Sequence, residues 1–310
     1  MSVSFCGLAL AHPVINGSGT FDAIAARAVF GDALDREFPF AAYVSKTITL
    51  EARVGNPPPR LWEAPSGLIN SIGLPNKGLE AYIEEDLPRL NLAVPLITNV
   101  MGSSAQEFSL LLQACEEQPQ IAAVELNVSC PNVRTGLDIG ADPRQLEQLL
   151  RAVRASTRKP LIVKLTPNTA DVGVCAQAAQ AGGAEAVSLI NTLRAMALAP
   201  SGRRLPPPLL NGGPAANVAA APARSPGPWL GGATGGLSGP AVRSVALAQV
   251  AAVAARVSIP VVGMGGVQCA ADAQDLLDVG ATLVAVGTAS FCDPAAGAAV
   301  ARGLRFSTTE

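Results

Sequence analysis

The chain has 310 residues, 49% of them hydrophobic, and a formal net charge of −2. That length suits one large α/β barrel, whose core needs no disulfide or metal to hold it together. The small net charge argues against nucleic acid or an anionic membrane surface as the main partner.

Short apolar runs that each end in a small or polar residue recur along the chain. Near-continuous apolar runs of this length are typical of strands buried on both faces of a parallel sheet. The eight predicted strands cover residues 13–18, 41–46, 94–99, 121–127, 160–164, 186–191, 260–264 and 283–287.

Helical segments separate most of these runs. The clearest helix start is Asp142-Pro143, an N-cap followed by a proline in the first turn. We also expect Ser103 to cap a helix, and Gly182-Gly183 to end another. The predicted helices lie in residues 103–117, 142–156, 169–181, 240–256, 270–279 and 294–302.

Strands that alternate with helices predict an α/β fold, a (β/α)8 TIM barrel forming a single domain over residues 1–310. A doubly wound sheet is the alternative, since periodicity does not establish closure. Two long connections interrupt the alternation, residues 47–80 after the second strand and residues 192–239 after the sixth. The second is a Pro/Gly/Ala-rich loop insertion, and a loop of that length is typical of a lid or a disordered segment.

Histidine and cysteine usage limits the chemistry. His12 is the only histidine, and the six cysteines contain no CxxC pair. We therefore expect no metal site and no iron–sulfur cluster held by this chain, and acid–base work must use Cys, Lys, Asp, Glu or Tyr. The scattered cysteines, and the lack of a signal peptide or a bilayer-spanning apolar stretch, indicate a cytoplasmic protein.

The active site of such a barrel lies at the carboxyl ends of the strands. The residues found there are Ser18, Lys46, Asn99, Asn127, Lys164, Asn191, Gly265-Gly266 and Gly287-Thr288. Asparagine amides suit a ring with alternating N–H and C=O groups, and lysines suit a carboxylate, a phosphate or an electron-rich ring. Glycine-rich turns after the last strands commonly bind phosphate. Any one of these features is often only structural, but their joint position predicts a phosphate-bearing cofactor beside a planar, anionic substrate.

Cys130 follows the fourth predicted strand, within NVSCPNVRTG. A cysteine taken alone is more often an inert packing residue. Here Pro131 favours an extended backbone at Cys130, and a neighbouring lysine would favour the reactive thiolate. We expect the remaining cysteines to be packing residues: Cys6, Cys115, Cys175, Cys269 and Cys292.

Distinctive short stretches lie at or near the candidate residues. They are NGSGT (16–20), SKT (45–47), GNPPPR (55–60), NSIGLPN (70–76), ELNVSCPN (125–132), VKLTPN (163–168), INT (190–192), TGGLSGPA (234–241), GMGG (263–266) and AVGTA (285–289). At these stretches the sequence resembles the dihydroorotate dehydrogenases, along nearly the whole chain. NVSCPN together with NSIGLPN is a specific signal, whereas GMGG alone is weak.

The resemblance implies a class within the family. A cysteine base at Cys130 and a first strand starting near Pro13, without an N-terminal membrane extension, are similar to class 1. TGGLSGPA and NVRTGLDIG resemble class 1B, in which electrons reach NAD, and not the fumarate-using class 1A. The 192–239 connection is longer than the family's usual loop, so the resemblance does not indicate what covers the phosphate side.

The resemblance also implies a reaction and a set of binding residues. The family oxidises (S)-dihydroorotate to orotate in de novo pyrimidine (UMP) biosynthesis; Cys130 would take the C5 proton while FMN takes the C6 hydride, and Lys164 would stabilise negative charge on the reduced ring. Positions matching FMN contacts are Ser18, Lys46, Thr47, Asn99, Asn127, Lys164, Ile190, Gly239, Gly265, Gly266, Gly287 and Thr288. Positions matching substrate contacts are Lys46, Asn70, Ser71, Ile72, Gly73, Leu74, Asn127, Asn132, Asn191 and Thr192.

Class 1B members work with a second subunit that carries FAD and a 2Fe–2S cluster. This sequence has no clustered cysteines and no G-x-G-x-x-G motif opening a βαβ unit, so it resembles the FMN subunit alone. The resemblance implies a homodimer within a heterotetramer. The alternatives are a class 1A enzyme, an FMN barrel of the dihydropyrimidine dehydrogenase type, a lyase or isomerase barrel that binds a sugar phosphate, and a non-catalytic flavin-binding scaffold.

Overall fold

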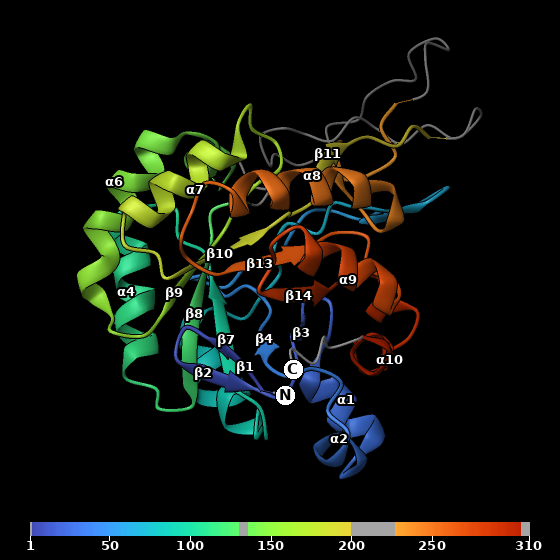
Figure 1. The fold of residues 1–310 in the computed structure, drawn as a ribbon, viewed down its shortest axis with the longest axis horizontal. Coiled ribbons are helices and arrows are strands. Elements are labelled where there is room, and N and C mark those ends of the chain that lie inside the picture. Colours follow the sequence, from blue (N-terminus) through green and yellow to red (C-terminus); the bar gives the residue numbers. More distant parts are fainter. Residues whose placement is uncertain (1, 130–135, 200–226, 305–310) are drawn as a thin grey trace, which may run out of the picture.

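A barrel of eight parallel strands forms the centre of the computed structural model, which describes residues 2–129, 136–199 and 227–304 (Figure 1). In sheet order the strands are β3 (Val14–Asn16), β14 (Leu283–Val286), β13 (Val261–Met264), β10 (Ala186–Leu189), β9 (Leu161–Lys164), β8 (Ile121–Asn127), β7 (Leu96–Val100) and β4 (Tyr43–Val44). Each of the eight predicted runs overlaps one of these strands, and only β7 extends beyond its run, by one residue, so the strand prediction is confirmed.

The barrel closes between β3 and β4, the first and last strands of the sheet order. The Asn16 side chain joins them, because its Oδ1 accepts from Val44 N at 2.7 Å and its Nδ2 donates to Val44 O at 2.8 Å. The backbone adds a bond from Ala41 N to Val14 O at 2.9 Å. The (β/α)8 prediction is therefore confirmed, and the doubly wound alternative is wrong.

The interior of the barrel is apolar toward the amino ends of the strands. Ile15, Val44, Ile97 and Val262 belong to one buried cluster there. The cluster also includes Phe5 and Leu10 of an antiparallel hairpin, β1 (Val3–Phe5) and β2 (Leu8–Leu10), at the lower end of the barrel in Figure 1. Fully burying a side chain such as Phe5 contributes about 1.5–3 kcal/mol, so the hairpin is a stabilising plug.

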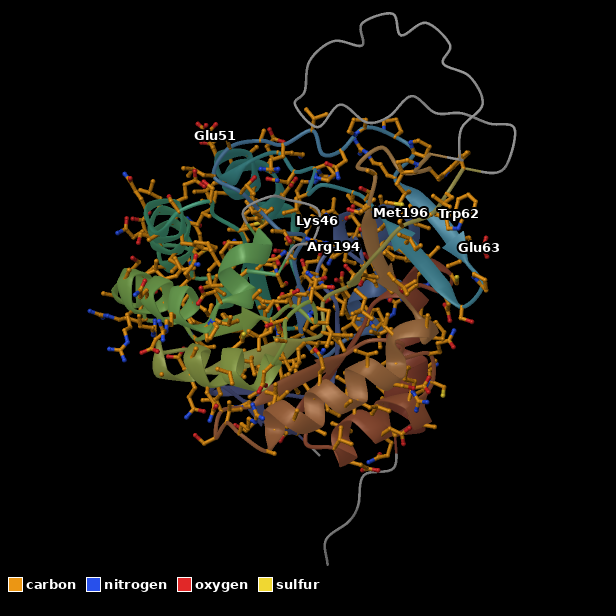
Figure 2. The ribbon with its side chains drawn as sticks, turned by 90° about the horizontal axis from the view of Figure 1, so that it is seen from above. Lys46, Glu51, Trp62, Glu63, Arg194 and Met196 are labelled. Carbon is orange, nitrogen blue, oxygen red and sulfur yellow. The ribbon has the colours of Figure 1, made fainter. Side chains whose placement is uncertain are left out.

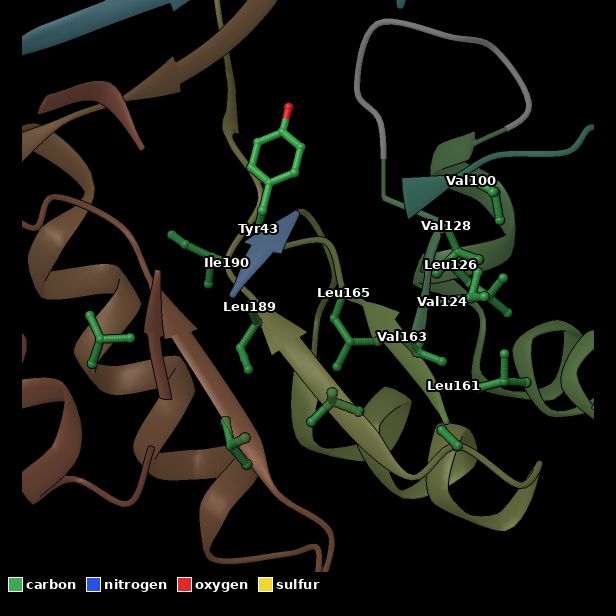
Figure 3. Packing of buried hydrophobic residues seen from close by; sticks show 14 of the residues in the cluster. Tyr43, Val100, Val124, Leu126, Val128, Leu161, Val163, Leu165, Leu189 and Ile190 are labelled. Carbon is green, nitrogen blue, oxygen red and sulfur yellow. The ribbon is translucent and has the colours of Figure 1, made fainter. Parts of the chain in front are cut away.

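A second cluster fills the space between the outward faces of the strands and the helices (Figure 3). Val124 and Leu126 point outward from β8 and belong to it, whereas Ala123 of the same strand belongs to the interior cluster. The covering helices are α4 (Ala105–Glu116), α6 (Pro143–Val153), α7 (Val172–Ala181), α8 (Arg243–Ala254), α9 (Ala270–Asp278) and α10 (Ala296–Gly303). All six predicted helices are present.

Of the two helix caps predicted from the sequence, one is confirmed and one needs a correction. Asp142 caps α6 as predicted, accepting from Arg144 N at 2.9 Å. The prediction that Ser103 caps α4 is wrong: Ser104 is the cap and accepts from Glu107 N at 3.2 Å. Ser103 N instead donates to the Glu107 carboxylate at 2.8 Å, so the Ser104 hydroxyl and the Glu107 side chain each satisfy one backbone N–H at the start of the helix.

Shorter elements connect the barrel units. They are α1 (Ala23–Phe30), α2 (Ala33–Arg36), α3 (Leu79–Ala81), a π-helical turn η1 (Tyr82–Asp86), α5 (Gly136–Ala141), and the 3-10 turns η2 (Leu87–Arg89), η3 (Arg154–Ser156), η4 (Pro240–Val242) and η5 (Thr288–Phe291). None of the described helices is both long and apolar enough to cross a bilayer.

The two long connections build a small antiparallel sheet, which we call the rim sheet, with the strand order β11-β12-β6-β5. Its strands are β5 (Leu61–Ala64), β6 (Gly67–Asn70), β11 (Leu193–Ala195) and β12 (Gly235–Ser238). Figure 2 labels Trp62 and Glu63 on β5, and Met196, which follows β11. The segment predicted as a loop over residues 192–239 therefore has a strand near each end, and residues 200–226 lie outside the described residues.

Candidate active site

The upper interior of the barrel, toward the carboxyl ends of the strands, is polar. Asn99, Glu125, Lys164 and Ser188 each stand two residues beyond an apolar residue of the interior cluster, so alternation along a strand points them inward. The register places Asn99 beside Glu125, and Lys164 between Asn127 and Ser188. These residues form a polar layer directly above the apolar one.

Lys164 is a buried cation within this layer. Its side chain is 6% exposed. Among the described residues no hydrogen bond or ion pair engages its ammonium group, although a buried charge is costly unless it is paired. Asn99 has a similar unmet need: its Oδ1 is buried and receives no hydrogen bond from the part of the chain that is described. The layer thus presents a cation and an acceptor that suit an anionic, N–H-bearing planar ligand.

Hydrogen bonds join several of the candidate residues in a continuous chain across the barrel mouth. Asn127 Nδ2 donates to Thr47 Oγ1 at 3.2 Å, and its Oδ1 accepts from Ser129 Oγ at 3.0 Å. Ser129 Oγ in turn accepts from Asn191 Nδ2 at 2.9 Å. Asn191 Oδ1 accepts from Thr192 N at 2.9 Å. Predicted cofactor and substrate residues are therefore held in one network.

The NSIGLPN loop meets the rim sheet at the end of that network. Asn70 Nδ2 donates to Gly236 O at 3.2 Å. Gly236 also faces Thr192, because a Cβ on this glycine would lie 1.8 Å from Thr192 Oγ1. Ser71 accepts from Asn56 Nδ2 at 3.1 Å, so the preceding GNPPPR segment supports the loop.

The next residues of that loop, Ile72 to Leu74, have tightly defined backbones. Ile72 O accepts from Asn56 N at 3.0 Å. Gly73 has φ +75°, and a Cβ there would lie 2.5 Å from Asn56 N, so only glycine fits. Leu74 also has positive φ, +58°, and is buried against Met101. The loop is a formed structure supported from below.

Glycine-rich turns gather at another part of the mouth. A Cβ on Gly266 would lie 3.1 Å from Gly239 O, and a Cβ on Gly239 would lie 3.6 Å from Thr288 Cγ2. Thr288 Oγ1 donates to Ser238 Oγ at 2.9 Å. Gly265 lies against Ile190, with 3.2 Å between its would-be Cβ and Ile190 Cγ1. This arrangement of β12, β13 and β14 turns is of the kind that binds phosphate through backbone N–H groups.

Ser18 and Lys46 complete the mouth. Ser18 Oγ donates to Ser45 O at 2.7 Å and lies 3.4 Å from Thr47 Oγ1. The Lys46 side chain lies against Gly19, where a Cβ would approach its Nζ to 3.1 Å. Gly287 lies against the same NGSGT segment that contains Ser18, because a Cβ on this glycine would be 3.6 Å from Thr20 Cγ2.

Two predicted site residues, Cys130 and Asn132, lie outside the described residues. The residue before Cys130 is described: Ser129 is fully buried and fixed by the network. His12 precedes β3, at the end of the barrel opposite the candidate site, and burial lowers its pKa.

The remaining cysteines divide into two groups. Burial raises the pKa of Cys115 to about 12 and that of Cys6 to about 11, and it also raises the pKa of Cys175, so these thiols fit the packing interpretation. The packing interpretation is wrong for Cys269 and Cys292, which are exposed. Both stand at helix ends: Cys269 is the N-cap of α9 and Cys292 follows η5. These positions are at the surface and outside the buried helix faces, which explains why the two thiols are exposed.

The sequence reasoning missed Glu125. Counting only the residue at each strand end gave a set without a carboxylate, yet Glu125 lies in the same inward-facing row as Asn127, two residues earlier on β8. The period of two along a strand was the signal that could have found it. Among the described residues no group of three or more His, Cys, Asp or Glu side chains is placed to hold a metal ion.

Comparison with known proteins gives one consistent family. The family model described as "Dihydroorotate dehydrogenase" matches residues 1–205 and 219–306. The protein named "Dihydroorotate dehydrogenase B (NAD(+)), catalytic subunit" of Pelobacter propionicus is 42% identical over 306 residues, which cover 98% of this chain and 92% of the relative. Proteins of the same name are 42% identical in Desulforudis audaxviator, over 100% of this chain and 92% of the relative, and 39% identical in Geobacter sulfurreducens, over 97% and 90%.

Proposed function

Because the chain belongs to the dihydroorotate dehydrogenase family, we propose that it oxidises dihydroorotate to orotate in pyrimidine synthesis, as the FMN-bearing catalytic subunit of an enzyme that reduces NAD. The observation that carries this proposal is the buried Lys164, which has no partner among the described residues and lies beside asparagine side chains at the barrel mouth. Such a layer suits a flat ring that carries N–H and C=O groups and develops negative charge.

FMN fits the residues present. Its phosphate would lie at the turns around Gly239, Gly266 and Thr288, whose backbones approach one another closely. Lys164 and Asn99 would meet the ring, and Ser18, Lys46, Thr47, Asn127, Ile190, Gly265 and Gly287 complete the proposed cofactor set. When bound, FMN would supply the acceptor for the C6 hydride.

The substrate side is formed by the network and the supported loop. Asn127, Asn191 and Thr192 would hold the dihydroorotate ring, and the 70–74 loop with Lys46 would hold its carboxylate. Cys130 and Asn132, outside the described residues, are proposed from the family resemblance: Cys130 as the base that takes the C5 proton, and Asn132 as a ring contact. Lys164 would stabilise the charge that develops as the hydride leaves.

Anaerobic mixing with dihydroorotate tests the activity. The flavin absorbance should bleach in the wild type, and Cys130→Ala should still bind FMN but bleach at least about a hundredfold more slowly. Cys6→Ala is the matched control, because that cysteine lies in the turn of the β1–β2 hairpin, at the end of the barrel opposite the mouth, and it should bleach as the wild type does. Unimpaired bleaching in Cys130→Ala would remove Cys130 from the mechanism.

The electron acceptor and partners form a separate part of the proposal. We propose a homodimer that binds an electron-transfer subunit carrying FAD and a 2Fe–2S cluster, in the cytoplasm. The relatives' name, "catalytic subunit", supports a partner chain. The purified chain alone should not reduce NAD with dihydroorotate; NAD reduction without a second chain would contradict this.

The same experiment decides between the alternatives. Turnover with fumarate would favour a class 1A enzyme, and faster reduction by dihydrouracil than by dihydroorotate would favour the dihydropyrimidine type. A purified chain without bound flavin would favour the sugar-phosphate barrel. A flavin that does not bleach would favour the non-catalytic scaffold.

A further inference from the structure

Glu125 is a carboxyl group in the interior of the barrel that the proposed reaction does not use. It stands on β8 between Ala123 of the apolar interior and Asn127 of the mouth, and its side chain is 4% exposed. Ser188 Oγ donates to its Oε1 at 2.6 Å, and Asn99 Nδ2 donates to its Oε2. No lysine or arginine among the described residues forms an ion pair with it.

A buried carboxyl in this position requires a reason. A structural interior would be more stable with an apolar side chain here, because burying a charge without a cation partner is unfavourable. Its two partners are neutral donors from the neighbouring strands, β7 and β10, on either side of the layer. Both carboxyl oxygens accept, and this pattern matches an ionised carboxylate, which can only accept.

The charge of Lys164 stands in the same layer. Lys164 opposes Asn127, two residues beyond Glu125 on β8. A rise of about 3.3 Å per residue and a strand spacing of about 4.8 Å place the two Cα atoms about 8 Å apart. The two opposite charges are thus neighbours without direct contact, and both border the place proposed for the flavin ring.

The hydrogen bond between Glu125 and Asn99 fixes which way the Asn99 amide faces. Because a carboxylate only accepts, it selects the nitrogen end of the Asn99 amide as the end that faces it. The oxygen end is left buried and without a donor among the described residues. An oxidised flavin ring carries an N–H, which is the donor this oxygen lacks.

We propose that Glu125 is a positioning residue of the flavin site, resting on the proposed function. Its carboxylate fixes the Asn99 amide with Oδ1 free to accept from the flavin ring, and its negative charge offsets the charge of Lys164 beneath the ring. Glu125 therefore holds the reduction potential of the bound flavin lower than Lys164 alone would set it.

Titration of the apoprotein with FMN, followed by measurement of the midpoint potential, tests this role. Glu125→Gln keeps the shape and removes the charge; it should raise the FMN dissociation constant roughly tenfold and shift the potential to a more positive value. Ser188→Ala is the matched control, because it removes one donor and keeps the charge, so its potential should equal that of the wild type. Circular dichroism of the apo form should show that Glu125→Gln folds, so that a change in affinity or potential can be assigned to the flavin site.

Each other outcome overturns the inference. An unchanged potential in Glu125→Gln refutes the charge role, and an unchanged dissociation constant refutes the orientation role. A Glu125→Gln chain that fails to fold shows a structural role instead. The measurements need no dihydroorotate, so failure of the inference is distinct from failure of the proposed function, which a wild-type chain unable to bind FMN would indicate.

Discussion

The Ser129 hydroxyl links the two halves of the candidate site, so its removal is the most direct test of the network. It donates to Asn127 Oδ1 at 3.0 Å and accepts from Asn191 Nδ2 at 2.9 Å. Ser129→Ala removes both bonds. Neither partner is left without a bond, because Ser129 N still donates to Asn127 and Ser129 O still accepts from Asn191, each at 3.3 Å.

The expected loss follows from this geometry. Two hydrogen bonds at about 1 kcal/mol each give a loss of about 2 kcal/mol in the free energy of unfolding, without the larger penalty of an orphaned buried group. That corresponds to a fall of the melting temperature by roughly 4 °C. Without the Ser129 hydroxyl, the Asn127 and Asn191 side chains are less ordered in the free protein. Orotate must then order them when it binds, and this entropic cost should raise its dissociation constant roughly tenfold.

Ser290→Ala provides a matched control. Ser290 is also buried, but its hydroxyl has no hydrogen-bond partner among the described residues, so its removal should be neutral or slightly stabilising. Urea denaturation of both apo variants gives the stabilities, and flavin absorbance changes on titration with orotate give the affinities. A Ser129→Ala chain as stable as wild type, or a Ser290→Ala chain equally destabilised, would refute the assigned role of the network.

Three further changes probe the surroundings. At pH 8 iodoacetamide should modify the exposed Cys269 well before Cys115, whose pKa burial raises to about 12, and mass spectrometry of the folded protein would contradict this if both reacted equally fast. Gly266→Ala should weaken FMN binding roughly tenfold, because φ is +75° and the new Cβ would lie 2.7 Å from a side chain of α8; an unchanged fluorescence titration would argue against the phosphate turn. Hydrogen bonds from Thr157 and two backbone N–H groups lower the pKa of Glu116 in the folded state. The stability that Glu116→Gln loses should therefore be full above the ordinary glutamate pKa of about 4.3 and should fade as the pH falls through the lowered pKa of the folded state. A difference in urea midpoint that stays constant over this pH range would contradict that cause.

The barrel was predictable because parallel strands covered on both faces need near-continuous apolar runs, and this sequence has them. The two predicted helix caps were correct to within one residue, since Asp142 stands directly before Pro143 and Ser103 lies beside the actual cap, Ser104. Other starts were less accurate: a helix predicted from Thr169 begins at Val172, after its cap Asp171. Closure was not readable, because the Asn16 amide that joins β3 to β4 belongs to no periodic pattern.

The rim sheet could not be predicted from strand propensity. Its strand β12 reads GGLS, and glycine is normally unfavourable in strands. Glycine is needed here because the backbone of β6 comes too close to β12 for a side chain: a Cβ on Gly235 would lie 2.4 Å from Asn70 O. Such a requirement comes from a partner strand about 165 residues away in the chain, which a local pattern cannot contain.

The same reasoning explains why strand-end positions gave most of the candidate site but missed its floor. The interior of the barrel has an apolar layer toward the amino ends, which the β1–β2 hairpin seals, and a polar layer toward the carboxyl ends. The apolar layer stabilises the fold and appears in the sequence as hydrophobic periodicity. Among the described residues, the polar layer leaves Lys164 without a partner and Asn99 Oδ1 without a donor, and a ligand bound at the mouth would supply both. Glu125 was missed because a carboxylate within an apolar run does not add to the hydrophobic pattern that predicts a strand; in our proposal its role concerns the bound ring and not the stability of the strand.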